Sequence, residues 1–99
     1  MRLIYAERAI SDIAGIYDMI TVDSVASAQR VEDAIRARCE ELADFPLASS
    51  TTDEPDIRRR AVTRYPYTIF FRFRARIAAV EIARVIPGIQ VRDLEHMPD

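Results

Sequence analysis

The sequence predicts an α+β domain in which two helices pack on one face of a mostly antiparallel sheet. A short apolar stretch opens the chain, and two segments with apolar residues at three- and four-residue steps follow it. Three segments typical of strands then occupy most of the second half. With 99 residues, 49% of them hydrophobic, the chain can form a single core, so we expect one domain over residues 1–99.

The first expected strand lies within residues 1–6, at Arg2–Tyr5, and residues 7–45 are expected to form a helical hairpin. The first helix runs from Glu7 to about Thr21. The second helix is expected to begin after an N-cap at Asp23 or Ser24 and to end near Asp44, before Phe45 and Pro46. The apolar stripes are Ile10, Ile13, Ala14, Tyr17 and Ile20 in the first helix, and Ala28, Val31, Ile35, Cys39 and Leu42 in the second.

Residues 47–56 are expected to form a polar loop, residues 57–88 a three-stranded antiparallel region, and residues 89–99 a C-terminal tail. The expected strands are Ile57–Arg64, Tyr67–Arg74 and Ile77–Ile86. A tight hairpin at Arg74-Ala75-Arg76 joins the last two strands, although no Gly or Asn favours it.

Strand alternation predicts which side chains meet the helices. In the middle strand, Tyr67, Ile69, Phe71 and Phe73 share one face, and Thr68, Phe70, Arg72 and Arg74 share the other. In the last strand Val80 and Ile82 are out of phase with Val85, so we expect a β-bulge near Ala83-Arg84 that turns Arg84 outward. The predicted core is Leu3, Ile13, Tyr17, Ile20, Val31, Ile35, Leu42, Ile69, Phe71, Val80 and Ile82.

Charge divides along the chain. Residues 1–56 contain five arginines and twelve acidic residues, whereas residues 57–92 contain nine arginines and one acidic residue, Glu81. Guanidinium groups suit carboxylate and phosphate partners, so the basic strands indicate a surface for an acidic tail or a nucleic-acid complex. The plainer alternative is a solvated, partly ion-paired face, in which Glu81 pairs across strands with Arg72.

The sequence indicates no cofactor and no metal, because it lacks a P-loop and any Cys/His metal spacing. The single cysteine, Cys39, lies on an apolar helical stripe and is expected to pack in the core. No apolar run of 18 residues occurs, so we expect no membrane contact. One cysteine and no visible signal peptide suit a cytoplasmic protein.

Two segments, Tyr65–Arg72 (YPYTIFFR) and Val80–Gly88 (VEIARVIPG), follow one another in the second half. Together with Ile16-Tyr17 and Phe45-Pro46, their order and spacing resemble the RelE/ParE superfamily of toxins from bacterial type II toxin–antitoxin pairs. The resemblance extends from Leu3 to about Leu94, and the ParE-like branch is favoured. It implies a small α+β fold with two helices on one face of a mostly antiparallel sheet.

The resemblance also implies two alternative activities. RelE-like members cut messenger RNA on the ribosome, whereas ParE-like members inhibit DNA gyrase. Both are neutralised by an antitoxin whose disordered tail folds over the toxin. We therefore expect a ParD-like antitoxin in a hetero-oligomer, gyrase as target, and DNA contact only indirectly through the antitoxin. An inactive member that only binds its antitoxin is a further alternative.

Departures from the family pattern favour the ParE-like activity. Many relatives carry His-Gly and then a basic residue after the last strand, where this chain has Pro87 and, two residues after Gly88, Gln90. The single histidine, His96, lies three residues from the end, and arginines cannot shuttle protons. We therefore expect no catalytic residue, and an endoribonuclease only if the chain is an enzyme. The candidate partner- or target-binding residues are Arg58, Arg60, Phe70, Arg72, Arg84 and Arg92.

Overall fold

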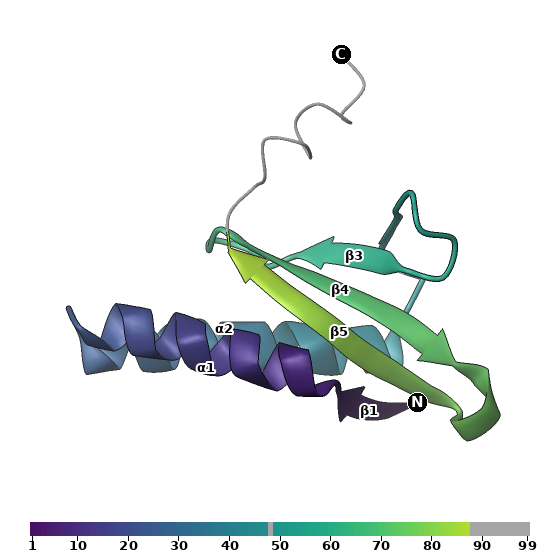
Figure 1. The fold of residues 1–99 in the computed structure, drawn as a ribbon, viewed down its shortest axis with the longest axis horizontal. Coiled ribbons are helices and arrows are strands. Elements are labelled where there is room, and N and C mark those ends of the chain that lie inside the picture. The colour runs from purple at the N-terminus through teal and green to yellow at the C-terminus, as the bar shows by residue number, and fades with distance from the viewer. Residues whose placement is uncertain (48, 88–99) are drawn as a thin grey trace, which may run out of the picture.

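The computed structural model describes residues 1–47 and 49–87. Two helices cover one face of a five-stranded sheet with the strand order β1-β5-β4-β3-β2 (Figure 1). The elements in chain order are β1 (Arg2–Tyr5), α1 (Glu7–Thr21), α2 (Val25–Asp44), β2 (Ser50–Thr51), β3 (Arg58–Ala61), β4 (Tyr67–Arg74), the 3-10 turn η1 (Ala75–Ile77) and β5 (Ala79–Pro87). The predicted α+β fold is confirmed, with a strand, a helical hairpin and then antiparallel strands.

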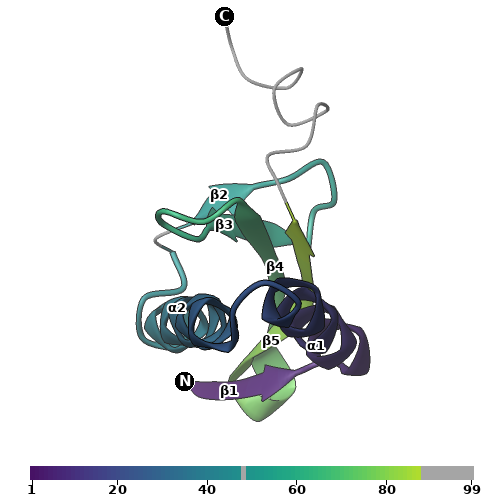
Figure 2. The same cartoon turned by 90° about the vertical axis from the view of Figure 1, so that its left-hand side faces the viewer.

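The second helix forms as its sequence predicts. Ser24 is the N-cap, and its hydroxyl accepts a hydrogen bond from the Ser27 N–H at 3.0 Å. The whole predicted stripe, Ala28, Val31, Ile35, Cys39 and Leu42, is buried. The two helices lie side by side under the sheet (Figure 2).

The predicted stripe of α1 is partly wrong. Ile10 is 53% exposed and Ala14 is exposed, whereas Ala9, Ile13 and Ile16 are buried. Two overlapping sets of apolar residues in α1 both have helical spacing, and the packing of α1 against β5 buries only one of them. Of the predicted core residues, Tyr17 is therefore only partly buried, as are Leu3 and Ile20.

The sheet differs from the predicted strands at its outer side and at one turn. The predicted polar loop contains the short strand β2, which pairs with β3, and β3 ends at Ala61 rather than Arg64. Because no Gly or Asn supports a tight hairpin at Arg74-Ala75-Arg76, β4 and β5 are joined by η1 and by Ala78 at φ 49°. The last strand consequently begins at Ala79 instead of Ile77.

The predicted bulge in β5 is confirmed. Phe70 pairs with Arg84 and Phe71 pairs with Ile82, which leaves Ala83 as the extra residue. The shift lets Ile82 and Val85 both point to the core, where they are 0% and 1% exposed.

Neither helix in the described part of the chain has the length and apolar character needed to span a membrane.

Candidate functional site

The strand register separates the candidate residues into two sets. Arg58 pairs with Phe71 and Arg60 with Ile69, so these two arginines lie on the face that meets the helices. Arg59 lies on the opposite face, as alternation predicts. We call this opposite face, which neither helix covers, the open face; it includes Arg59, Phe70, Arg72, Arg74 and Glu81.

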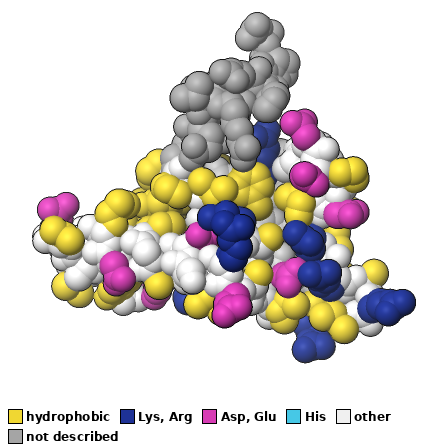
Figure 3. Space-filling model, in the orientation of Figure 1, with side chains coloured by type: hydrophobic (Ala, Val, Ile, Leu, Met, Phe, Trp, Pro, Cys, Tyr) yellow, Lys and Arg dark blue, Asp and Glu magenta, His cyan; other side chains and the backbone are white. Residues whose placement is uncertain are grey.

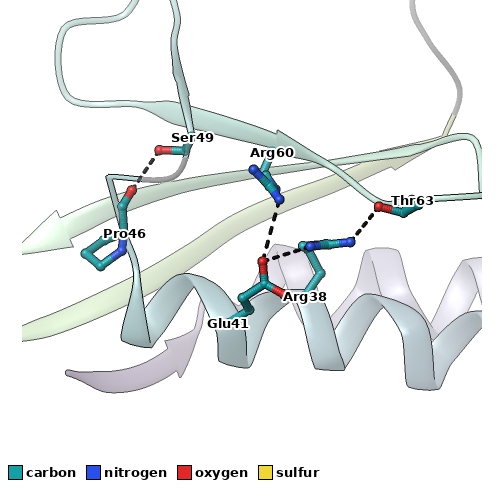
Figure 4. A network of polar contacts seen from close by, with 6 residues as sticks. All are labelled: Arg38, Glu41, Pro46, Ser49, Arg60 and Thr63. Atoms are coloured by element: carbon teal, nitrogen blue, oxygen red, sulfur yellow. Dashed lines mark hydrogen bonds and ion pairs between the residues drawn. The ribbon is translucent and has the colours of Figure 1, made fainter.

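Arg58 forms hydrogen bonds to another part of the same chain. Its Nε donates to the Ser49 hydroxyl at 2.7 Å and its Nη2 to the Ser49 carbonyl at 2.9 Å. The Ser49 hydroxyl in turn donates to the Pro46 carbonyl at 2.7 Å (Figure 4). Arg58 therefore fastens the segment between α2 and β2 to the sheet, a structural role that the sequence does not predict.

Arg60 belongs to a polar network between α2 and β3. Its Nη2 lies 3.5 Å from Glu41 Oε1, which also accepts a hydrogen bond from Arg38 Nη1 at 2.9 Å. Arg38 Nη2 donates to the Thr63 hydroxyl at 2.6 Å (Figure 4). The network ties the second helix to β3 and to the turn after it, so Arg60 lies on the opposite face of the sheet from the open-face candidates.

The open face carries arginines around one carboxylate. Arg72 Nε lies 3.7 Å from Glu81 Oε1, which confirms the predicted cross-strand pair, and Arg74 Nη2 lies 2.8 Å from the same oxygen. Since two guanidinium groups share one carboxylate, this part of the surface keeps an excess of positive charge. Figure 3 shows arginine side chains gathered over the strands, whereas the helical end carries acidic and apolar side chains.

Phe70 lies between two arginine positions. It pairs with Arg59 of β3 on one side and with Arg84 of β5 on the other. The ring faces away from the helices as predicted, but it is half-buried rather than exposed. An aromatic ring beside arginines is typical of residues that dominate protein–protein interfaces.

The guanidinium of Arg84, expected to face outward, bonds instead to Asp12 of α1. Its Nε and Nη2 donate to Asp12 Oδ2 and Oδ1 at 2.8 and 3.1 Å, and the Val85 N–H donates to Asp12 Oδ2 at 2.9 Å. Burial alone would raise the pKa of Asp12, but the hydrogen bonds from Arg84 and Val85 lower it below its usual value. No sequence signal points to Asp12, because the pairing joins residues 72 positions apart.

Burial favours the neutral form of two tyrosines and of the single cysteine. Burial raises the pKa of Tyr5 to about 12 and that of Cys39 to about 11, and it also raises the pKa of Tyr67. Cys39 is buried in the core as predicted. Within residues 1–47 and 49–87, no three His, Cys, Asp or Glu residues are placed to hold a metal. Arg92 and His96 lie outside the described residues.

The comparisons with known proteins agree with this fold. A family model described as the ParE toxin of the type II toxin–antitoxin system parDE matches residues 3–91. No curated protein sequence matches the chain.

Among solved structures, the chromosomal ParDE system of P. aeruginosa is similar with a TM-score of 0.79 and 21% identity, covering 90% of this chain and 97% of that one. The isolated RelE toxin of E. coli is similar with a TM-score of 0.67 and 14% identity, covering 95% of this chain and 90% of that one. The E. coli RelBE complex gives a TM-score of 0.65 at 15% identity, covering 90% and 96%. The match of the family model over most of the sequence shows that this chain belongs to the ParE toxin family of type II toxin–antitoxin systems.

Proposed function

We propose that this chain inhibits DNA gyrase in the cytoplasm and is neutralised by a ParD-like antitoxin. Membership of the ParE toxin family supports this proposal. The observation that carries it is the chemistry of the open face. There Arg72 and Arg74 hold the carboxylate of Glu81, and Phe70 supplies an apolar contact beside them. Such a surface binds a partner through charge and packing, without proton transfer.

A ribosome-dependent endoribonuclease is the second candidate, because the chain shares its fold with E. coli RelE. Cleavage of RNA through its 2′-hydroxyl needs a positioned base and acid with pKa values near neutrality. On the described part of the open face the ionisable groups are arginines and Glu81, and Glu81 is bound to two of those arginines. Tyr67 is buried on the other face. Gyrase inhibition is therefore favoured.

The antitoxin contact follows from the same surface. One of the similar structures is a ParDE system and another is a RelBE toxin–antitoxin complex. We propose that an acidic, amphipathic segment of the antitoxin folds onto the open face. Its carboxylates pair with Arg72 and Arg74, and an apolar side chain packs on Phe70. Segments that fold on binding commonly combine these two kinds of contact. Contact with DNA is then made by the antitoxin.

Co-purification tests the antitoxin contact. The reading frame next to the gene should encode a short protein with a ribbon-helix-helix pattern and an acidic tail. Co-expression of this protein with the chain should yield one joint peak in size exclusion at micromolar concentration. Arg72→Ala/Arg74→Ala should weaken the complex, whereas Arg76→Ala, which removes an exposed arginine from η1, should not. Two separate peaks for the unmodified pair would contradict the proposal.

A pair of activity assays tests the target. The chain, freed from its antitoxin, should inhibit supercoiling by purified gyrase, and induced cells should show damaged DNA and filaments before any loss of message. Growth arrest should survive His96→Ala. Rapid cleavage of messages on ribosomes, with gyrase unaffected, would establish the endoribonuclease instead. Antitoxin binding without growth arrest would identify an inactive family member.

A further inference from the structure

Among the described residues, none forms a strand beside the end of β5 on the side of β1. Strand β1 pairs with residues 79–82 of β5, and the chain then leaves the sheet through Ala6, whose N–H donates to the Ile82 carbonyl at 2.8 Å. Beyond that point Asp12 takes the place of a strand, since its carboxylate accepts the Val85 N–H. An acidic side chain of α1 thus satisfies one backbone donor of this edge.

The same carboxylate holds Arg84 by two parallel hydrogen bonds. This two-pronged geometry fixes both the position and the plane of a guanidinium. The side chains of Arg84 and Asp12 are 34% and 17% exposed, so the carboxylate is covered more than the guanidinium. The Nη1 amino group takes no part in the pair. Asp12 therefore holds Arg84 in one arrangement with donors left for a second acceptor.

The β-bulge places this fixed arginine next to Phe70. Because Ala83 is the extra residue, Arg84 rather than Ala83 lies directly across from Phe70. An arginine whose charge is already balanced by a carboxylate attracts a further anion weakly, but its remaining N–H groups are oriented donors for a neutral oxygen. An oriented donor beside a half-buried aromatic ring suits a peptide that offers one carbonyl oxygen and one apolar side chain.

We propose that Asp12 is a positioning residue for partner binding: it holds Arg84 ready to donate to a carbonyl oxygen of the antitoxin segment whose apolar side chain packs on Phe70. This inference rests on the proposed function and assigns Asp12 and Arg84 to the antitoxin site. Fixing the guanidinium beforehand reduces the loss of side-chain freedom when the partner binds.

The test is a double-mutant cycle on antitoxin affinity, using Asp12→Asn, Arg84→Ala and the double variant. Asparagine keeps an oxygen for the Val85 N–H but loses the charge that holds Arg84. Asp12→Asn alone should weaken antitoxin binding about tenfold, the change expected when a charge-assisted hydrogen bond is lost. In the Arg84→Ala background it should have no further effect, because Asp12 acts through Arg84.

Two further variants control the cycle. Glu41→Gln makes the same change from carboxylate to amide in the α2–β3 network and should leave antitoxin affinity unchanged. Arg84→Lys keeps the charge, loses the two-pronged geometry and replaces Arg84→Ala in the cycle if the alanine variant does not fold. Urea unfolding of each variant separates a loss of stability from a loss of affinity.

The outcomes are distinct. If Asp12→Asn weakens binding equally in both backgrounds, or in neither, the positioning role is wrong while the proposed function stands. If the cycle shows coupling in gyrase inhibition but not in antitoxin affinity, the assignment to the antitoxin is wrong. If the unmodified chain does not bind the antitoxin at all, the proposed function fails and this inference fails with it.

Discussion

The two faces of the sheet use the same residue type in opposite ways. On the face that meets the helices, Arg58 bonds to Ser49 and Arg60 lies against Glu41, so both arginines hold elements of the fold together. On the open face, Arg72 and Arg74 share one carboxylate beside Phe70. Arginines of one basic segment therefore divide between those that hold elements of the fold together and those that lie on the open face.

The net charge of a segment therefore does not reveal which of its side chains a partner can reach. Nine arginines lie between residues 57 and 92, but strand register and internal partners decide which of them a partner can reach. Substitutions on the helix-facing side should change stability first. Substitutions on the open face should change affinity first, and the following predictions test this contrast from the largest expected effect to the smallest.

Phe71→Ala should lower the free energy of unfolding by about 3–5 kcal/mol, because Phe71 is 0% exposed at the centre of the core. Its sequence neighbour Phe70 is half-buried on the open face, so Phe70→Ala should cost less stability and more antitoxin affinity. Urea denaturation and a binding titration measure the two quantities. Equal losses of stability would show that the two faces do not differ as described.

Arg58→Ala should lower the free energy of unfolding by about 1–2 kcal/mol, because it removes two hydrogen bonds from a half-buried guanidinium to Ser49. Arg74→Ala breaks only a surface ion pair and should cost about 0.5 kcal/mol or less. Antitoxin affinity should fall more for Arg74→Ala than for Arg58→Ala. A larger affinity loss for Arg58→Ala, at unchanged stability, would move the binding surface to the helix side.

Asp12→Asn should cost about 1 kcal/mol of stability at pH 7, and this difference from the unmodified chain should shrink in acid. The folded chain holds the pKa of Asp12 below its unfolded value, with Arg84 and Arg8 as the nearby cations. The stability that the Asp12 carboxylate contributes is therefore complete above the unfolded pKa of about 3.9. It is lost as the pH falls from there through the lower pKa of Asp12 in the folded chain. Urea denaturation of both chains at pH 7 and at a series of lower pH values measures this stability difference. A difference independent of pH would mean that the charge of Asp12 contributes nothing.

Hydrophobic periodicity predicts the buried face of a helix well when only one set of apolar residues has the required spacing. The stripe of α2 contains a single set of apolar residues, and all of them are buried. In α1, Ile10 and Ile13 both have helical spacing with other apolar residues, and only the position of α1 beside β5 exposes Ile10. The change of phase between Ile82 and Val85 is sufficient to predict the position of the bulge, since a strand has only two faces.

The candidate site was less predictable, because it depends on contacts between distant segments. Alternation placed Arg72 and Phe70 on one face, but it could not show that Arg58 and Arg60 share the face of the helices until the register of β3 against β4 was known. Two-residue strands such as β2 leave too little pattern to detect in a polar loop. Asp12 and Arg84 meet only because α1 crosses the end of β5.

The parallel pairing of β1 with β5 has a consequence for how the protein is made. The first strand pairs with the last described one, as in Arg2 with Ala79, so the sheet closes only after a loop of nearly the whole chain. Pairings between distant segments slow folding relative to helical proteins of similar size. On the ribosome, β1 emerges before β5 and stays unpaired with it until β5 has been synthesised. The complete sheet therefore forms only after β5 has emerged, when both helices have already been synthesised.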